Sequence, residues 1–248
     1  MTGAQNQDMS QVVEQFNEYG YLVVEDLIPR ELAEKLAERL KDHMTSNGSD
    51  GKASLYERAL FNQLSQDDLD LFVNLISHPF LLDLAKGTLG EGFQLAEVGS
   101  RWMLPGEDGL GLHVGSPAHE LKNHGFAFPS NCFVLTFSWC LDDMTSENGN
   151  RFFMPFSHHS GRPPREGADY PDIAEITAPA GSLIAFNSAT WHGYHPNESQ
   201  DKSRLEFCSA FHVPWLDPDV IGWQLMNKSV RDKMPEEIQR ACRKVREG

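Results

Sequence analysis

Two histidines that are far apart in the sequence stand in settings that suit metal ligands. His113 follows the glycine-rich residues 109–112, and His192 is preceded by a tryptophan and followed by a glycine. Imidazole is a favourable ligand for Fe(II), and mononuclear oxygenase sites usually join two histidines to one carboxylate. A carboxylate two residues after the first histidine would share its face of a strand. Here that position is Gly115, which has no side chain that could bind a metal.

Several further segments, taken in order, resemble the phytanoyl-CoA dioxygenase family of Fe(II)/2-oxoglutarate enzymes. They are residues 16–24 (FNEYGYLVV), 141–149 (LDDMTSENG), 154–158 (MPFSH) and 191–204, which runs from the tryptophan before His192 to Arg204. The resemblance covers most of the chain. It implies an α+β fold: a double-stranded β-helix, or cupin-like jelly roll, flanked by N-terminal and C-terminal helices. It also implies that His113 and His192 bind Fe(II), with 2-oxoglutarate and O2 as co-substrates.

The expected catalytic set is His113, Gly115, His192 and Arg204. Arg204 suits the distal carboxylate of 2-oxoglutarate, because a guanidinium group binds a carboxylate through two parallel hydrogen bonds. The alternative role for this arginine is a surface ion pair. Further contacts come from side chains expected to face the interior of the barrel or to lie beside the first histidine. They are Thr136 and Ser138 for 2-oxoglutarate, and Arg101, Phe126 and Phe128 for the substrate.

Gly115 is the point at which this sequence departs from the family, which has aspartate or glutamate there. The His-x-Gly pattern resembles that of the iron/2-oxoglutarate halogenases. Loss of the carboxylate leaves one coordination position open and the iron one unit more positive, and chloride can correct both. The sequence therefore predicts a halogenase that chlorinates an unactivated C–H bond through a ferryl-oxo intermediate and chlorine rebound. Its substrate is expected to be a free-standing small molecule, either nucleotide-like or another natural-product precursor, with no carrier protein.

Three alternatives stay open at this point. One is a hydroxylase or oxidase whose third ligand is water or a carboxylate from elsewhere, such as Glu120. Another is a relative that has lost its metal and its activity. The last is a jelly roll that binds a ligand without any metal, because a fold alone does not determine a function.

The hydrophobic pattern divides the chain into a helical N-terminal part, a β-rich middle and a helical tail, all within one domain over residues 1–248. Residues 1–9 are expected to be flexible and residues 45–54 to form a loop. The jelly-roll core is expected over about residues 94–213. Helices are predicted over residues 10–19, 30–43, 66–76, 79–87 and 217–248. Strands are predicted over residues 21–24, 94–103, 110–114, 132–141, 151–154, 174–178, 182–187 and 205–213.

Composition excludes some classes of partner. The formal net charge is −15 for 248 residues, which argues against non-specific binding to a nucleic-acid polymer or to an anionic membrane. The four cysteines have no zinc-type spacing, so buried, reduced thiols are expected. No signal peptide and no long apolar run are visible, so the expected location is the cytoplasm.

Overall fold

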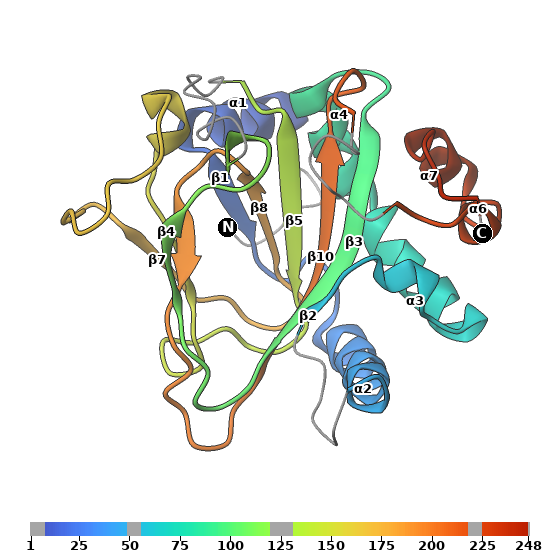
Figure 1. The fold of residues 1–248 in the computed structure, drawn as a ribbon, viewed down its shortest axis with the longest axis horizontal. Coiled ribbons are helices and arrows are strands. Elements are labelled where there is room, and N and C mark those ends of the chain that lie inside the picture. Colours follow the sequence, from blue (N-terminus) through green and yellow to red (C-terminus); the bar gives the residue numbers. More distant parts are fainter. Residues whose placement is uncertain (1–7, 49–55, 120–130, 218–224, 248) are drawn as a thin grey trace.

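In the part of the chain that the structure describes, ten strands form two antiparallel sheets that face each other, and helices cover the outer side of the larger sheet (Figure 1). The computed structural model describes residues 8–48, 56–119, 131–217 and 225–247. The strands are β1 (Tyr21–Val24), β2 (Tyr56–Glu57), β3 (Gln94–Met103), β4 (Leu110–His113), β5 (Val134–Cys140), β6 (Arg151–Phe153), β7 (Ala174–Ile176), β8 (Leu183–Asn187), β9 (His192–Tyr194) and β10 (Arg204–His212). The larger sheet has the order β1-β8-β5-β10-β3-β2, and the smaller has the order β4-β9-β6-β7. This arrangement confirms the predicted α+β fold with a double-stranded β-helix at its core.

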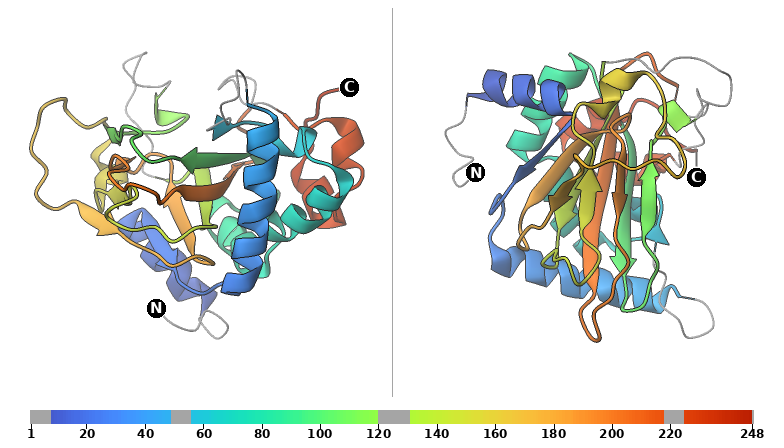
Figure 2. Two further views of the ribbon diagram at one scale, coloured as in Figure 1. Left: turned by 90° about the horizontal axis from the view of Figure 1, so that it is seen from below. Right: turned by 90° about the vertical axis from the view of Figure 1, so that its left-hand side faces the viewer.

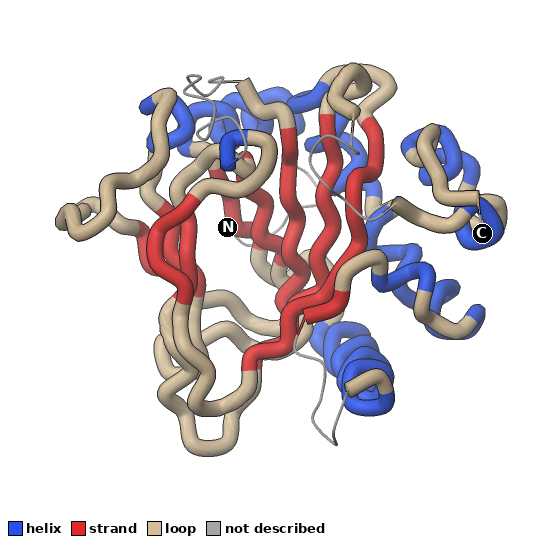
Figure 3. Tube along the Cα trace, viewed as in Figure 1, coloured by secondary structure: helices blue, strands red, loops and turns tan. Residues whose placement is uncertain are grey.

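The helices pack on the side of the larger sheet that faces away from the smaller one (Figures 1 and 2). The tube in Figure 3 separates this helical layer from the two groups of strands. The helices are α1 (Met9–Tyr19), α2 (Arg30–Ser46), α3 (Gln66–Ile76), α4 (Pro79–Leu89), α6 (Lys228–Arg231) and α7 (Glu236–Ala241), with short 3-10 turns at Leu60–Asn62 and Ser157–Ser160.

The central strand β5 shows how one sequence serves both sides of the sheet. Its side chains alternate, as those of a strand must. Leu135, Phe137 and Trp139 are fully buried and join the helices in the main hydrophobic core. Val134 and Thr136 point the other way and line the space between the sheets. The predicted division of this strand into a packing face and an interior face is therefore confirmed.

Several predicted boundaries were wrong. Helix α1 begins at Met9, one residue earlier than predicted, and Asp8 caps it, because the side chain of Asp8 accepts a hydrogen bond from the backbone N–H of Ser10. Helix α2 runs on through residues 45 and 46, which were expected to be loop; residues 49–54 of that loop lie outside the described part. Within the described residues of 217–248, the long helical tail is reduced to the short helices α6 and α7. Strands β2 and β9 were not predicted at all.

The four cysteines are free thiols, as expected. Cys132, Cys140 and Cys242 are buried, whereas Cys208 is partly exposed to the interior space. In the described part of the chain, no helix has the length and apolar character that a membrane crossing requires.

Candidate functional site

The two histidines singled out from the sequence lie side by side in the smaller sheet. Strands β4 and β9 pair in antiparallel register, so that His113 is directly opposite His192, and their ring centroids are 4.3 Å apart. Side chains on directly opposed residues point to the same side of a sheet. Both rings line the cavity between the two sheets. The structure thus brings together, from positions far apart in the sequence, the pair expected to bind a metal.

A glycine between the two strands allows this close pairing. A Cβ atom on Gly193 would collide with the carbonyl oxygen of Leu110 on the neighbouring strand and with the ring of Phe152. The collision with Leu110 involves backbone, which cannot rotate out of the way. The glycine that follows His192 in the sequence motif is therefore required for the strand pairing that positions the histidine.

Backbone carbonyls orient both imidazole rings. The Nδ1 atom of His113 lies 3.0 Å from the carbonyl oxygen of Gly111, and that of His192 lies 2.6 Å from the carbonyl oxygen of Thr190. A carbonyl oxygen only accepts, so each Nδ1 carries a proton, and in the neutral form of each ring the lone pair is on Nε2. Such carbonyl contacts are typical of histidines that bind metals through Nε2.

Electrostatics keep His192 neutral. Burial, reinforced by the neighbouring His113, lowers the pKa of His192 well below its ordinary value. A neutral imidazole is the form that binds a metal ion. Near neutral pH, His192 therefore needs to lose no proton before it binds a metal.

Gly115 lies next to this pair and lines the same cavity. Its backbone N–H donates to the carbonyl oxygen of Ser188 at 2.7 Å, which fixes the chain just after His113. Its φ angle is not in the left-handed region, so the backbone does not demand glycine. A Cβ atom here would lie 3.2 Å from the Cβ of Ser188, a tight contact but not a prohibitive one. The missing side chain is therefore a feature of the cavity and not a consequence of backbone strain.

The cavity has a volume of about 490 Å³, which is in the range of small-molecule sites. The histidine pair lies on the smaller sheet, and Arg101, Thr136 and Cys208 contribute from the larger sheet. Across the described residues, no group of three His, Cys, Asp or Glu side chains is placed to hold a metal ion. The site therefore offers two protein ligands from the described chain.

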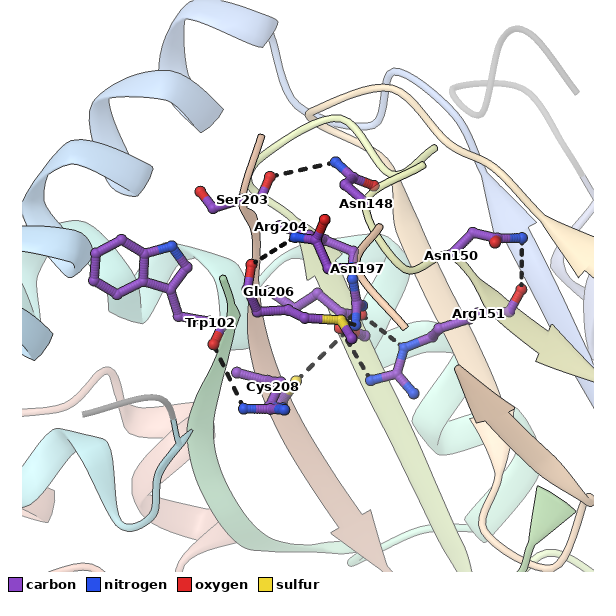
Figure 4. Close-up of polar contacts among 12 residues, drawn as sticks. Trp102, Asn148, Asn150, Arg151, Asn197, Ser203, Arg204, Glu206 and Cys208 are labelled. Atoms are coloured by element: carbon purple, nitrogen blue, oxygen red, sulfur yellow. Dashed lines mark hydrogen bonds and ion pairs between the residues drawn. The ribbon is translucent and has the colours of Figure 1, made fainter. Parts of the chain in front are cut away.

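Arg204 is not at the surface of this cavity. It is buried on β10 with a side-chain exposure of 1%, and its Nη1 donates to a carboxylate oxygen of Glu206 (Figure 4). Glu206 also accepts from Arg151 Nε at 2.7 Å, from Arg151 Nη2 at 3.2 Å and from the hydroxyl of Ser138 at 2.5 Å. Arg151, in contrast to Arg204, lines the cavity.

The remaining predicted contacts divide into three groups. Thr136 and Arg101 line the cavity, and their contacts with 2-oxoglutarate and the substrate stay predictions. Ser138 faces the interior but is fully buried and binds Glu206, so the cavity does not reach it. Phe126, Phe128 and Glu120 lie outside the described residues.

Sequence reasoning did not identify Arg151, Glu206, Tyr56 or Glu97, all of which lie in or beside the cavity. Glu97 pairs with Arg58 at 2.7 Å, and Tyr56 lines the wall next to it. Glu206 could have been found, because it is two residues after Arg204 and must share its face of the strand. For Arg151 the only signal was its position in the short strand predicted over residues 151–154.

The Glu206 carboxylate is expected to be a major source of stability. Burial alone would raise its pKa, but Arg151 and Arg204 lower that pKa from 4.5 to about 2. Replacing it by glutamine leaves two buried guanidinium groups without their partner, and we expect Glu206→Gln to lower the free energy of unfolding by about 3–5 kcal/mol at pH 7. The unfolded chain binds the proton at a higher pH, so this contribution is present above pH 4.5 and lost as the pH falls toward 2.

Urea unfolding of both proteins at pH 7 and pH 3 measures this effect. The difference in free energy of unfolding between the wild type and Glu206→Gln should be smaller at pH 3 than at pH 7 by about 2 kcal/mol. Glu175→Gln is the matched control, because Glu175 is 53% exposed in its pair with His195 and should contribute at most about 1 kcal/mol. If the difference in free energy of unfolding were the same at both pH values, the lowered pKa of Glu206 would be contradicted.

Comparisons with known proteins agree with this geometry. The sequence model of the phytanoyl-CoA dioxygenase (PhyH) family matches residues 16–205 of this chain. A protein from Aspergillus fumigatus named dioxygenase af480 is 24% identical over 67% of this chain and 50% of its own length. A methylphosphonate hydroxylase from Gimesia maris is 30% identical over 52% of this chain and 50% of its own length. The chain thus spans about half the length of the curated relatives it matches.

Solved structures share the fold at lower identity. HygX from Streptomyces hygroscopicus, solved with nickel and 2-oxoglutarate bound, superposes with a TM-score of 0.65 at 15% identity, covering 84% of this chain and 88% of that one. The α-ketoglutarate-dependent epimerase SnoN from nogalamycin biosynthesis gives a TM-score of 0.61 at 21% identity, covering 83% and 82%. With the family match extending over most of the chain and ending just past Arg204, this protein belongs to the phytanoyl-CoA dioxygenase (PhyH) family.

Proposed function

We propose that this protein is an Fe(II)- and 2-oxoglutarate-dependent oxidoreductase, and that it acts as a halogenase on a small molecule. The observation that carries the proposal is the pair His113–His192 on the wall of the cavity, with Gly115 beside it where a third ligand would stand. Fe(II), 2-oxoglutarate and O2 together supply an oxidant strong enough to break an unactivated C–H bond. Family membership and the relatives named as a dioxygenase and a hydroxylase support the oxidative chemistry.

The residues present fit a metal ion. Each imidazole has its Nδ1 proton engaged by a backbone carbonyl, and the lowered pKa of His192 keeps that ring neutral. An imidazole pair without a thiolate favours Fe(II) and similar ions over softer metals. Arg151 lines the cavity, and together with Arg204 and Glu206 it leaves one net positive charge for a dicarboxylate.

Gly115 supports the finer assignment to a halogenase. Without its carboxylate, the site has one less negative charge and one open position beside His113. Chloride matches both requirements, because it is a monoanion that can act as a metal ligand. The protein's own contribution is to hold the substrate carbon near that position and away from water.

The cavity supports a small-molecule substrate. Its volume of about 490 Å³ is in the range of small-molecule sites, and its walls combine the apolar side chains of Leu110 and Phe186 with the charged Glu97 and Arg101. We propose a free-standing polar small molecule, and we propose neither a nucleic-acid polymer, nor a membrane, nor a carrier protein as a partner.

An anaerobic optical titration tests the function. The apo-protein is titrated with Fe(II) and 2-oxoglutarate in sodium gluconate and then in sodium chloride at equal ionic strength. We expect a visible metal-to-ligand charge-transfer band that shifts when chloride replaces gluconate. If the band did not shift when chloride was added, the result would indicate an oxygenase of the hydroxylase type and refute halogenation. The absence of any band would refute the iron/2-oxoglutarate site itself.

A further inference from the structure

The carboxylate of Glu206 lies between Arg204 and Arg151, the second of which lines the cavity (Figure 4). A carboxylate between guanidinium groups is the arrangement that the distal carboxylate of 2-oxoglutarate would itself adopt. Here the side chain of Glu206 already accepts the hydrogen bond from Arg204 that a bound carboxylate would accept. The inference below rests on the proposed function and concerns which arginine remains for the co-substrate.

Arg204 has little left to offer a ligand. Its Nη1 donates to Glu206, its Nη2 lies 3.2 Å from the sulfur of Met103, and its Nε is buried without a partner among the described residues. The side chain of Arg204 is 1% exposed and lies behind the cavity wall, where its guanidinium is 5.6 Å from the ring centroid of Tyr194, a residue that lines the cavity. For a co-substrate to reach Arg204, Glu206 would have to leave both arginines and Ser138, which is costly for a buried carboxylate.

Arg151 is in the opposite situation. It lines the cavity and gives Nε and Nη2 to Glu206, while its Nη1 has no partner among the residues that the structure describes. It also stands at a suitable distance from the metal ligands. Phe153 is opposite His192 in the strand register and Arg151 is opposite Tyr194, two residues along on the same face. That step is about 7 Å, the scale of a five-carbon diacid.

The charges of the three residues agree with this assignment. Two guanidinium groups and one carboxylate have a net charge of +1. Of these three residues, Arg151 is the one that lines the cavity, so a ligand in the cavity would contact this charge through Arg151. A single distal carboxylate neutralises it. We propose that Arg151, and not Arg204, holds the distal carboxylate of 2-oxoglutarate, and that Glu206 closes Arg204 to the co-substrate.

Calorimetric titration of the Ni(II)-loaded protein under conditions without turnover tests this assignment. The two ligands are 2-oxoglutarate and 2-oxopentanoate, which has the same carbon chain with a methyl group in place of the distal carboxylate. We expect Arg151→Met to weaken 2-oxoglutarate binding by about 10- to 100-fold, because one charged hydrogen-bonded contact is lost. Binding of 2-oxopentanoate should stay within about 2-fold. The matched variant Arg204→Met should change either affinity by less than about 3-fold.

If a thermal melt shows that a methionine variant does not fold, Arg151→Lys and Arg204→Lys replace it. We again expect the larger loss of 2-oxoglutarate affinity in the Arg151 variant, but a smaller loss than with methionine. A selective loss of 2-oxoglutarate affinity in the Arg204 variant but not in the Arg151 variant would overturn the assignment. An equal loss of both ligands in the Arg151 variant would also overturn it, because the arginine would then act through the fold. Wild-type protein that binds Ni(II) but not 2-oxoglutarate would instead refute the proposed function, and this inference with it.

Discussion

Replacing His192 by alanine is expected to lower the affinity for Fe(II) by about 100-fold or more. The described chain offers two imidazole ligands, so this change removes half of the protein's direct hold on the metal. Changes to groups that only orient a ligand already cost 10- to 100-fold in affinity, and loss of the ligand itself should reach at least the upper end of that range. The charge-transfer band with 2-oxoglutarate should disappear at Fe(II) concentrations that saturate the wild type. Equilibrium dialysis with Fe(II) under argon measures the affinity directly.

His195→Ala is the matched control for this experiment. His195 is three residues further along and binds the exposed Glu175 on the surface of the molecule. Its loss should leave metal affinity within about 2-fold. If the two variants bound Fe(II) equally well, the pair His113–His192 would be structural and the metal site would have to be sought elsewhere.

The parts of this site that the sequence predicted are those set by short-range rules. His113 and Gly115 were chosen from a local motif, and His192 from a second one, and the register of β4 with β9 then places them together. The interior face of β5 followed from simple alternation. Strand β9 itself was missed, because three residues that include a glycine show no alternation to recognise.

The position of Arg204 could not be predicted in the same way. Arg204 begins β10, one residue before the strand that was predicted, and its access to the cavity depends on Glu206 and Arg151. The Arg151–Glu206 pair joins residues 55 positions apart, from different sheets. Only the three-dimensional pairing of strands reveals that the carboxylate of Glu206 forms ion pairs with both arginines. The fold was therefore more predictable than the distribution of charge inside it.

The second large effect is expected from Gly115→Asp. This change restores a carboxylate two residues after His113, on the same cavity wall. The carboxylate would take both the open coordination position and the charge that we assign to chloride. We expect chloride affinity, measured from the chloride-induced shift of the charge-transfer band, to fall by about 100-fold or more. With substrate and O2, chlorinated product should give way to hydroxylated product, because only hydroxyl remains for transfer.

Gly115→Ala separates the carboxylate from the steric change that accompanies it. Both variants add the same Cβ atom, which lies 3.2 Å from the Cβ of Ser188 and requires that residue to move by a few tenths of an ångström. Alanine brings no ligand, so the chloride-induced shift should survive in this variant while it is lost in Gly115→Asp. An equal loss in both would mean that bulk at residue 115, and not a missing ligand, controls the site. A chloride response that survives in both would place the halide away from Gly115 and remove the physical basis for calling this protein a halogenase.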